Sequence, residues 1–174
     1  MFYFVRHGQT DYSERNAKIY QGFGVNLAPL TEEGVRQIEE TARDPRLKGA
    51  DLILSSPYTR ALQTAAILSK ALMAPIAVET GLHEWLANKH YVYEDEETAE
   101  NACREYETHR GQYPDGAEKA WESAEMIRAR VLPVLQKYAH CEKVVVACHG
   151  MMMQAVTGCP HPENGGIVEF TLSF

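Results

Sequence analysis

Cysteine is scarce in this chain, and its spacing excludes two common uses of the residue. The four cysteines, Cys103, Cys141, Cys148 and Cys159, form no C-x-x-C pair, so neither a zinc ribbon nor a thioredoxin-type redox centre is indicated. Free thiols in a reducing compartment are the expected state. The chain also lacks the roughly 20 consecutive apolar residues of a transmembrane helix, and its first residues show no secretory signal pattern. We therefore expect a cytoplasmic protein with no membrane partner.

Positive charge is also in short supply. Lys and Arg number 17 against 24 Asp and Glu, which leaves a net charge of −7. A negative net charge is unfavourable for binding nucleic acid as a partner. By the same argument, it is at first view unfavourable for binding any phosphate ester. Apolar residues at 45% and charged residues at 24% are ordinary values for a globular protein. The length of 174 residues fits a single domain over residues 1–174.

Short apolar runs alternate with segments that favour helices. The runs predict strands at residues 2–5, 52–54, 76–78, 144–147 and 167–172. The segments between them predict helices at residues 31–43, 58–72, 126–135 and about 150–156. Thr31 is the expected N-cap of the first helix. This alternation predicts an α/β fold, a three-layer α/β/α sandwich with a largely parallel central sheet.

Polar residues follow three of the predicted strands directly. They form the sequences Arg6-His7-Gly8, Ser55-Ser56-Pro57 and Cys148-His149-Gly150. Ligands of parallel sheets bind at the carboxyl ends of the strands. If these three strands are neighbours, two histidines and the helix that carries Arg60 meet at one edge of the sheet.

The residues at this edge have the chemistry that phosphoryl transfer requires. The guanidinium groups of Arg6 and Arg60 match pairs of phosphate oxygens. A neutral imidazole, from His7 or His149, is a competent nucleophile. The other histidine and the arginines would then stabilise the equatorial oxygens. The leaving alkoxide needs a proton, so a carboxylic acid should stand nearby.

An ordered series of motifs spans nearly the whole chain: Arg6-His7-Gly8-Gln9-Thr10, Gln21-Gly22, Pro29-Leu30-Thr31 with Gly34, Ser55-Ser56-Pro57, Arg60-Ala61, Gln63-Thr64-Ala65, Leu82-His83-Glu84 and Val146-Ala147-Cys148-His149-Gly150. In these motifs the chain resembles the histidine phosphatase superfamily, also called the phosphoglycerate-mutase-like family. A lone Arg-His-Gly is weak evidence, whereas the series in this order is specific.

The resemblance implies a role for each matched residue at the phosphate. His7 would be the nucleophile and would be phosphorylated transiently. Arg6, Arg60 and His149 would hold the phosphoryl group, and the Gly150 amide would add a hydrogen bond. Neither a cofactor nor a metal is implied, and the spacing of the remaining histidines builds no metal site.

The resemblance also implies that Glu84 protonates the leaving group and then activates water. In the other large branch, that of acid phosphatases and phytases, the acid is an Asp directly after the second histidine. Gly150 occupies that place here, so the chain resembles the mutase-like branch. Glu79 is an alternative acid.

Some positions depart from the family pattern. Ser13 stands where the family usually has a phosphate-contacting Asn, and either Ser13 or Asn16 would replace it. Gln21 and Gly22 match the family and are further candidates for substrate binding. The stretch from Trp85 to Tyr93 differs from the family's usual sequence, which predicts an unusual leaving-group pocket.

The negative charge is concentrated in one segment. Residues 79–125 hold 13 acidic and four basic residues, a net charge of −9, so the rest of the chain carries +2. We expect this segment to be a mostly helical, cap-like insertion beside a mildly basic catalytic frame. Such a cap would disfavour highly anionic ligands.

These observations predict a metal-independent phosphatase that hydrolyses small phosphorylated metabolites through a phosphohistidine. A phosphoglycerate-type mutase is the alternative, but such an enzyme needs extra cover to keep water from its intermediate, and this short chain favours hydrolysis. A phosphate-binding regulatory module without turnover is the second alternative. The oligomeric state is left open.

Overall fold

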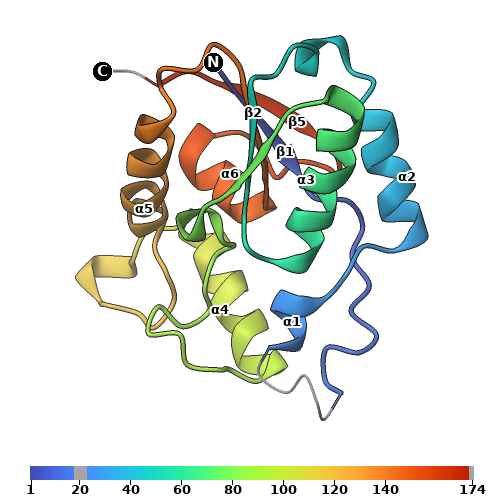
Figure 1. The fold of residues 1–174 in the computed structure, drawn as a ribbon. Helices are drawn as coiled ribbons and strands as arrows, with labels where there is room; N and C mark the ends of the chain where they lie inside the picture. The colour runs from blue at the N-terminus through green and yellow to red at the C-terminus, as the bar shows by residue number, and fades with distance from the viewer. Residues whose placement is uncertain (18–22, 173–174) are drawn as a thin grey trace.

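A central sheet of five strands organises the molecule. The computed structural model describes residues 1–17 and 23–172. The strands lie in the order β3-β2-β4-β1-β5 (Figure 1). All neighbours are parallel except β5, which pairs antiparallel with β1 at one edge. The strand bounds are Phe2–Arg6 for β1, Leu52–Ser55 for β2, Ile76–Val78 for β3, Val144–Cys148 for β4 and Ile167–Phe170 for β5.

Helices cover both faces of this sheet. Alternate strand residues point to opposite faces, so that Val145 packs with α2 (Glu32–Thr41) and α3 (Thr59–Leu72), whereas Val144 packs with α5 (Ala124–Lys137) and α6 (Gly150–Thr157). Each face has its own cluster of buried apolar side chains. The predicted α/β sandwich with a largely parallel sheet is confirmed, and its strands and main helices lie close to the predicted ranges.

The strand order brings the three polar strand ends together. In the sheet register, Arg6 lies opposite Cys148, and Ser55 lies opposite Ala147. The chain therefore leaves β1, β4 and β2 side by side at one edge. Thr31 caps α2 as predicted, because its hydroxyl oxygen accepts a hydrogen bond from the Gly34 amide at 2.9 Å.

The acidic segment 79–125 is less helical than predicted. It contains α4 (Glu96–Thr108), the short 3₁₀ turns η3 (Thr80–Leu82) and η4 (Pro114–Gly116), and loops. The loops have a physical cause: Tyr91 and Arg110 adopt positive φ angles of 59° and 52°, a conformation that no helix continues. Figure 1 shows α4 next to the short helix α1 (Gly24–Leu27), at the same end of the molecule.

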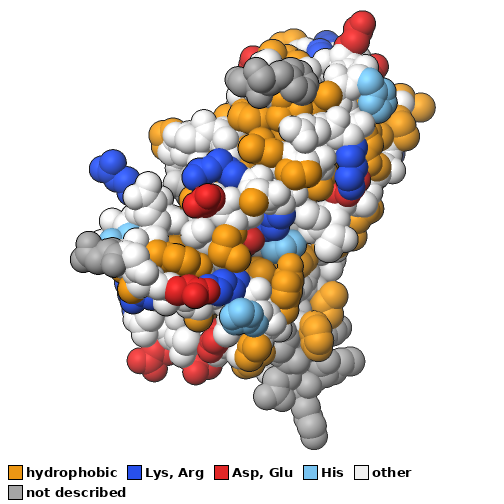
Figure 2. Space-filling view, turned by 90° about the vertical axis from the view of Figure 1, so that its left-hand side faces the viewer, with side chains coloured by type: hydrophobic (Ala, Val, Ile, Leu, Met, Phe, Trp, Pro, Cys, Tyr) orange, Lys and Arg blue, Asp and Glu red, His pale blue; other side chains and the backbone are white. Residues whose placement is uncertain are grey.

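Charged side chains are dispersed on the face drawn in Figure 2. Basic side chains there are separated by apolar and acidic ones rather than gathered in one patch. Over the described ranges 1–17 and 23–172, no helix is long and apolar enough to cross a membrane.

Candidate active site

His7 follows β1 directly and is 5% exposed. Its Nδ1 lies 2.8 Å from the carbonyl oxygen of Gly8 and 3.2 Å from the hydroxyl of Thr10. Because a carbonyl only accepts hydrogen bonds, Nδ1 carries the ring proton and donates it to Gly8. The lone pair of the ring therefore lies on Nε2.

Arg60 donates a hydrogen bond to Nε2 of His7, and its charge lowers the pKa of the ring. Arg60 comes from the first turn of α3, is 3% exposed, and its Nε lies 3.3 Å from Nε2 of His7. A second guanidinium nitrogen donates to the carbonyl of Val25 at 2.7 Å. Burial, and next the charge of Arg60, lower the pKa of His7 to about 3. The imidazole is therefore neutral at physiological pH, as a nucleophile must be.

Arg6 ends β1 and has an unused donor. Its Nη1 donates to the carbonyl of Pro162 at 2.6 Å, while its buried Nε has no hydrogen-bond partner in the described part of the chain. Burial lowers the pKa of Arg6, and the charge of Glu84 opposes that effect. A buried guanidinium nitrogen without a partner is costly, and a phosphate oxygen would satisfy it.

His149 is fully buried behind His7. The two ring centres are 5.2 Å apart, and Nε2 of His149 lies 2.7 Å from the hydroxyl of Ser56. Its Nδ1 has no partner within the described residues. Burial, and then the positive charge of Arg60, keep the pKa of His149 well below its ordinary value. Gly150 begins α6, where a Cβ would lie 2.4 Å from the ring of the exposed His161, so a side chain there would require that ring to move.

Three backbone amides hold the carboxylate of Glu84. One carboxylate oxygen accepts from the amides of Trp85 at 2.8 Å and Met152 at 3.1 Å, and the other from Met151 at 3.4 Å. These last two amides belong to the first turn of α6.

A cavity of about 540 Å³ opens onto these groups. His7, Arg6, Arg60, Glu84 and Asn16 line it together. The structure thus brings together the predicted nucleophile, the two arginines predicted to bind phosphate and the predicted acid.

Several other predicted residues do not line the cavity. His149 and Gly150 are buried, although the ring centre of His149 lies 5.2 Å from that of His7. Ser13 is exposed outside it, and its amide donates to Asp11. Gln21 and Gly22 fall outside the described residues. Glu79, the alternative acid, is bound instead by Lys137 and Tyr138 and does not line the cavity.

Sequence reasoning missed the aromatic walls of the cavity. Six aromatic side chains line it: Tyr12, Phe23, Tyr58, Trp85, Tyr91 and Tyr93. The unusual stretch from Trp85 to Tyr93 is a signal for half of them, but nothing in the sequence places α1 opposite that stretch. Within residues 1–17 and 23–172, no three His, Cys, Asp or Glu side chains converge as metal ligands.

Known proteins resemble the chain over most of its length. The phosphatase PhoE of Bacillus subtilis, described as uncharacterized, is 30% identical over 177 residues, which cover 97% of this chain and 84% of PhoE. Agropine synthesis reductase of Rhizobium rhizogenes is 27% identical over 183 residues, but the chain spans only 39% of that relative's length. The solved mycobacterial glucosyl-3-phosphoglycerate phosphatase has the same fold, with a TM-score of 0.71 and 20% identity over 95% of this chain and 88% of that one.

The family model agrees with the motifs and with the geometry. The model described as histidine phosphatase superfamily (branch 1) matches residues 2–159. This chain belongs to the histidine phosphatase superfamily, in its branch 1.

Proposed function

We propose that this protein is a phosphatase that hydrolyses small phosphomonoesters through a phosphohistidine at His7, without a metal ion. One observation carries the proposal: a buried, neutral imidazole whose proton sits on Nδ1 presents Nε2 to the cavity beside Arg60. The family membership and the phosphatase names among its relatives support it.

The reaction has two displacement steps. In the first, the Nε2 lone pair of His7 forms a bond to phosphorus while the bond to the ester oxygen breaks, and protonated Glu84 gives its proton to that oxygen. In the second, water attacks phosphorus, Glu84 takes a proton from it, and the bond between phosphorus and nitrogen breaks. Inorganic phosphate leaves, and His7 is neutral again.

The phosphoryl oxygens have several donors. Arg6 offers its unpartnered Nε, and Arg60 offers the Nε that rests on His7 in this structure. His149 would donate from Nδ1 if its Nε2 accepts the hydroxyl proton of Ser56. We assign the further phosphate contact to Asn16 rather than Ser13, since Asn16 lines the cavity, and we retain the Gly150 amide as a donor.

The side chains that line the cavity indicate the chemistry of the leaving group. Aromatic and aliphatic side chains dominate the cavity walls, and the acids that the described residues place beyond the phosphate end are Glu94, Glu96 and Glu100. Arg15 also lines the cavity, but it forms an ion pair with Glu96. We therefore expect a monoester with an apolar or aromatic leaving group and no second anionic group.

The function is tested by assaying 4-nitrophenyl phosphate with and without EDTA. We expect turnover that EDTA does not reduce and that His7→Ala abolishes. Loss of turnover with EDTA and its return with added metal would contradict the proposed mechanism.

The two alternatives have their own tests. A mutase would isomerise phosphoglycerate more than it releases inorganic phosphate. We expect no isomerisation, and only slow release of phosphate because phosphoglycerate carries a carboxylate. A regulatory module would bind inorganic phosphate but show no turnover of any ester in a panel of metabolite phosphates. The cytoplasmic location stays a prediction that cell fractionation can check.

A further inference from the structure

We infer that Arg130 is a positioning residue for Glu84, and that Glu122 is its charge partner. This inference rests on the proposed function, in which Glu84 protonates the leaving group. Neither residue lines the cavity, so neither is a catalytic residue.

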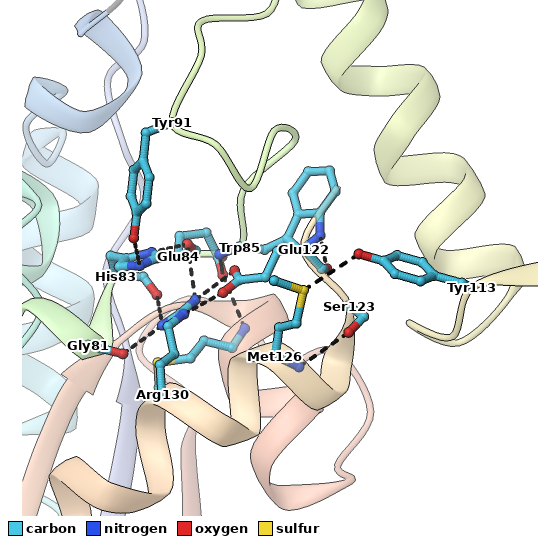
Figure 3. A network of polar contacts seen from close by, with 11 residues as sticks. Gly81, His83, Glu84, Trp85, Tyr91, Tyr113, Glu122, Ser123, Met126 and Arg130 are labelled. Carbon is cyan, nitrogen blue, oxygen red and sulfur yellow. Dashed lines mark hydrogen bonds and ion pairs between the residues drawn. The ribbon is translucent and has the colours of Figure 1, made fainter. Parts of the chain in front are cut away.

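Arg130 uses three of its five donors to hold the segment 81–84. It lies in α5 and reaches back to η3 and the residue after it, where Nη1 donates to the carbonyls of Gly81 at 2.6 Å and His83 at 2.9 Å (Figure 3). Its Nη2 donates to the carbonyl of Glu84 at 3.4 Å. Its two remaining N–H groups bind the Glu122 carboxylate at 2.6 and 2.9 Å. All five guanidinium donors therefore have acceptors.

Glu122 completes the arrangement from the other side. The Glu122 side chain is 5% exposed, so it needs a charge partner, and Arg130 is that partner at 16% exposure. The backbone of Glu122 also holds the residues after Glu84, since its amide donates to the carbonyl of Leu86 and its carbonyl accepts from the indole of Trp85, both at 2.9 Å. The chain on both sides of Glu84 is thus fixed.

The close packing of Gly81 supports the same role. A Cβ on Gly81 would lie 2.9 Å from a methyl of Val134 and 3.0 Å from the carbonyl oxygen of Arg130. This segment therefore sits directly against α5, within reach of the guanidinium. The peptide is held by Arg130 while the carboxylate is held by α6, which leaves Glu84 little freedom to move relative to His7.

Leaving groups separate positioning from general stability. An aryl phosphate with a good leaving group, such as 4-nitrophenyl phosphate, needs little proton donation, whereas benzyl phosphate needs it fully. We expect Arg130→Lys to lower kcat/KM, which reports the first displacement step, for benzyl phosphate by about 10- to 100-fold, since Lys keeps the charge but not the fork and a misplacement of 1 Å costs about that much. For 4-nitrophenyl phosphate we expect kcat/KM to fall by less than about threefold, because its leaving group needs little proton donation.

Three controls keep the result decisive. The first control is Arg128→Lys on the same helix, because Arg128 donates to the carbonyl of Ala155 and not to the segment at Glu84. This variant should leave kcat/KM for both substrates unchanged. The second control is thermal unfolding, which shows whether Arg130→Lys folds. If Arg130→Lys does not fold, Glu122→Gln, which keeps the shape of the side chain, is tested in its place. We expect Glu122→Gln to lower kcat/KM for benzyl phosphate with the same selectivity. Glu84→Gln should show the strongest selective loss.

The outcomes distinguish the two proposals. If Glu84→Gln lowers kcat/KM equally for both substrates, the proposed role of Glu84 as the acid for the leaving group fails. If Glu84→Gln is selective in kcat/KM while folded Arg130→Lys and Glu122→Gln lower kcat/KM equally for both substrates, or for neither, the positioning role of Arg130 is overturned.

Discussion

His7 and His149 are buried with exposed fractions of 5% and 0%, and this burial links the chemistry of the site to stability. The folded pKa of His7 is about 3 against an ordinary value of 6.5. Protonation therefore favours the unfolded chain. The corresponding stability is fully present above pH 6.5 and is lost as the pH falls toward the folded pKa. His149 shifts in the same direction.

We predict that the free energy of unfolding falls between pH 7 and pH 5, with His7 alone contributing about 2 kcal/mol of the loss. Urea denaturation at the two pH values measures it. His7→Asn should remove about that part of the pH dependence, whereas His90→Asn, at an exposed position, should leave it unchanged. An identical pH dependence in wild type and His7→Asn would show that His7 is not held neutral by the fold.

Arg60 carries the second prediction for a single residue. Arg60→Lys keeps the charge but loses the planar fork, so we expect kcat/KM for 4-nitrophenyl phosphate to fall by about 100-fold. The rise in Tm caused by inorganic phosphate should shrink as well. Arg43→Lys, in a surface pair with Glu40, is the control. Unchanged kcat/KM and phosphate binding in Arg60→Lys would remove Arg60 from the site.

Among the elements, the loop after β1 and the start of α2 approach each other closely. A Cβ on Gly34 would lie 2.2 Å from the carbonyl oxygen of Gln9, and one on Gly8 would lie 2.3 Å from the carbonyl oxygen of Gly34. The loop with Thr10, whose hydroxyl contacts His7, therefore packs directly against the backbone at the start of α2. This packing explains why glycine stands at both positions.

We predict that Gly34→Ala lowers the free energy of unfolding by about 1–3 kcal/mol and also lowers kcat, because the loop must move away from α2. Gly49→Ala is a matched control: Gly49 has a positive φ of 73°, and a Cβ there would meet no atom within 4 Å. It should lose stability through backbone strain alone and keep its kcat. A Gly34→Ala variant with full kcat would show that this contact does not position the His7 loop.

Much at this scale could be predicted from the sequence. Strands such as 144–148 are short, β-branched and apolar, and polar residues mark their ends, so local patterns are enough to locate His7, His149 and Arg60. The family resemblance adds Glu84. The prediction of a mostly helical segment 79–125 is wrong for its loops, because polar composition alone does not reveal the positive φ angles at Tyr91 and Arg110.

Contacts between distant elements could not be predicted in the same way. Arg130 reaches Gly81, 49 residues earlier, and no local pattern records that pairing. The same holds for the aromatic walls, where Phe23 of the segment before α2 faces the same cavity as Tyr91. Ser13 fits the family register, yet the turn that binds its amide to Asp11 leaves it outside the cavity.

For the molecule as a whole, the uneven charge explains how a chain of net charge −7 suits phosphate chemistry. Arg6 and Arg60 lie at the phosphate end of the cavity, whereas Glu94, Glu96 and Glu100 lie along its walls. Under the proposed function, a compact monoester would meet the arginines, and a second anionic group would meet the acids. We therefore expect the acidic segment to contribute selectivity rather than to oppose the reaction.

We predict that kcat/KM for 4-carboxyphenyl phosphate is lower than for phenyl phosphate by about fivefold at low salt, as expected for one repulsive charge contact. The difference in kcat/KM between the two substrates should become smaller at high salt, where charge interactions are screened. Glu100→Gln should also reduce this difference, whereas Glu39→Gln, at an exposed position on α2, should not. Equal kcat/KM for the two substrates at low salt would contradict a selective role of the acidic walls.

The central claim is that His7 becomes phosphorylated during turnover. Its most direct test is to mix the enzyme with radiolabelled phosphomonoester, quench within milliseconds in alkali, and locate the label by mass spectrometry. We expect an acid-labile, base-stable phosphoryl group on His7 that forms and decays at the rate of turnover, and none in His7→Ala. Continued turnover with no phosphorylated His7 at any time point, or full activity in His7→Ala, would contradict the account.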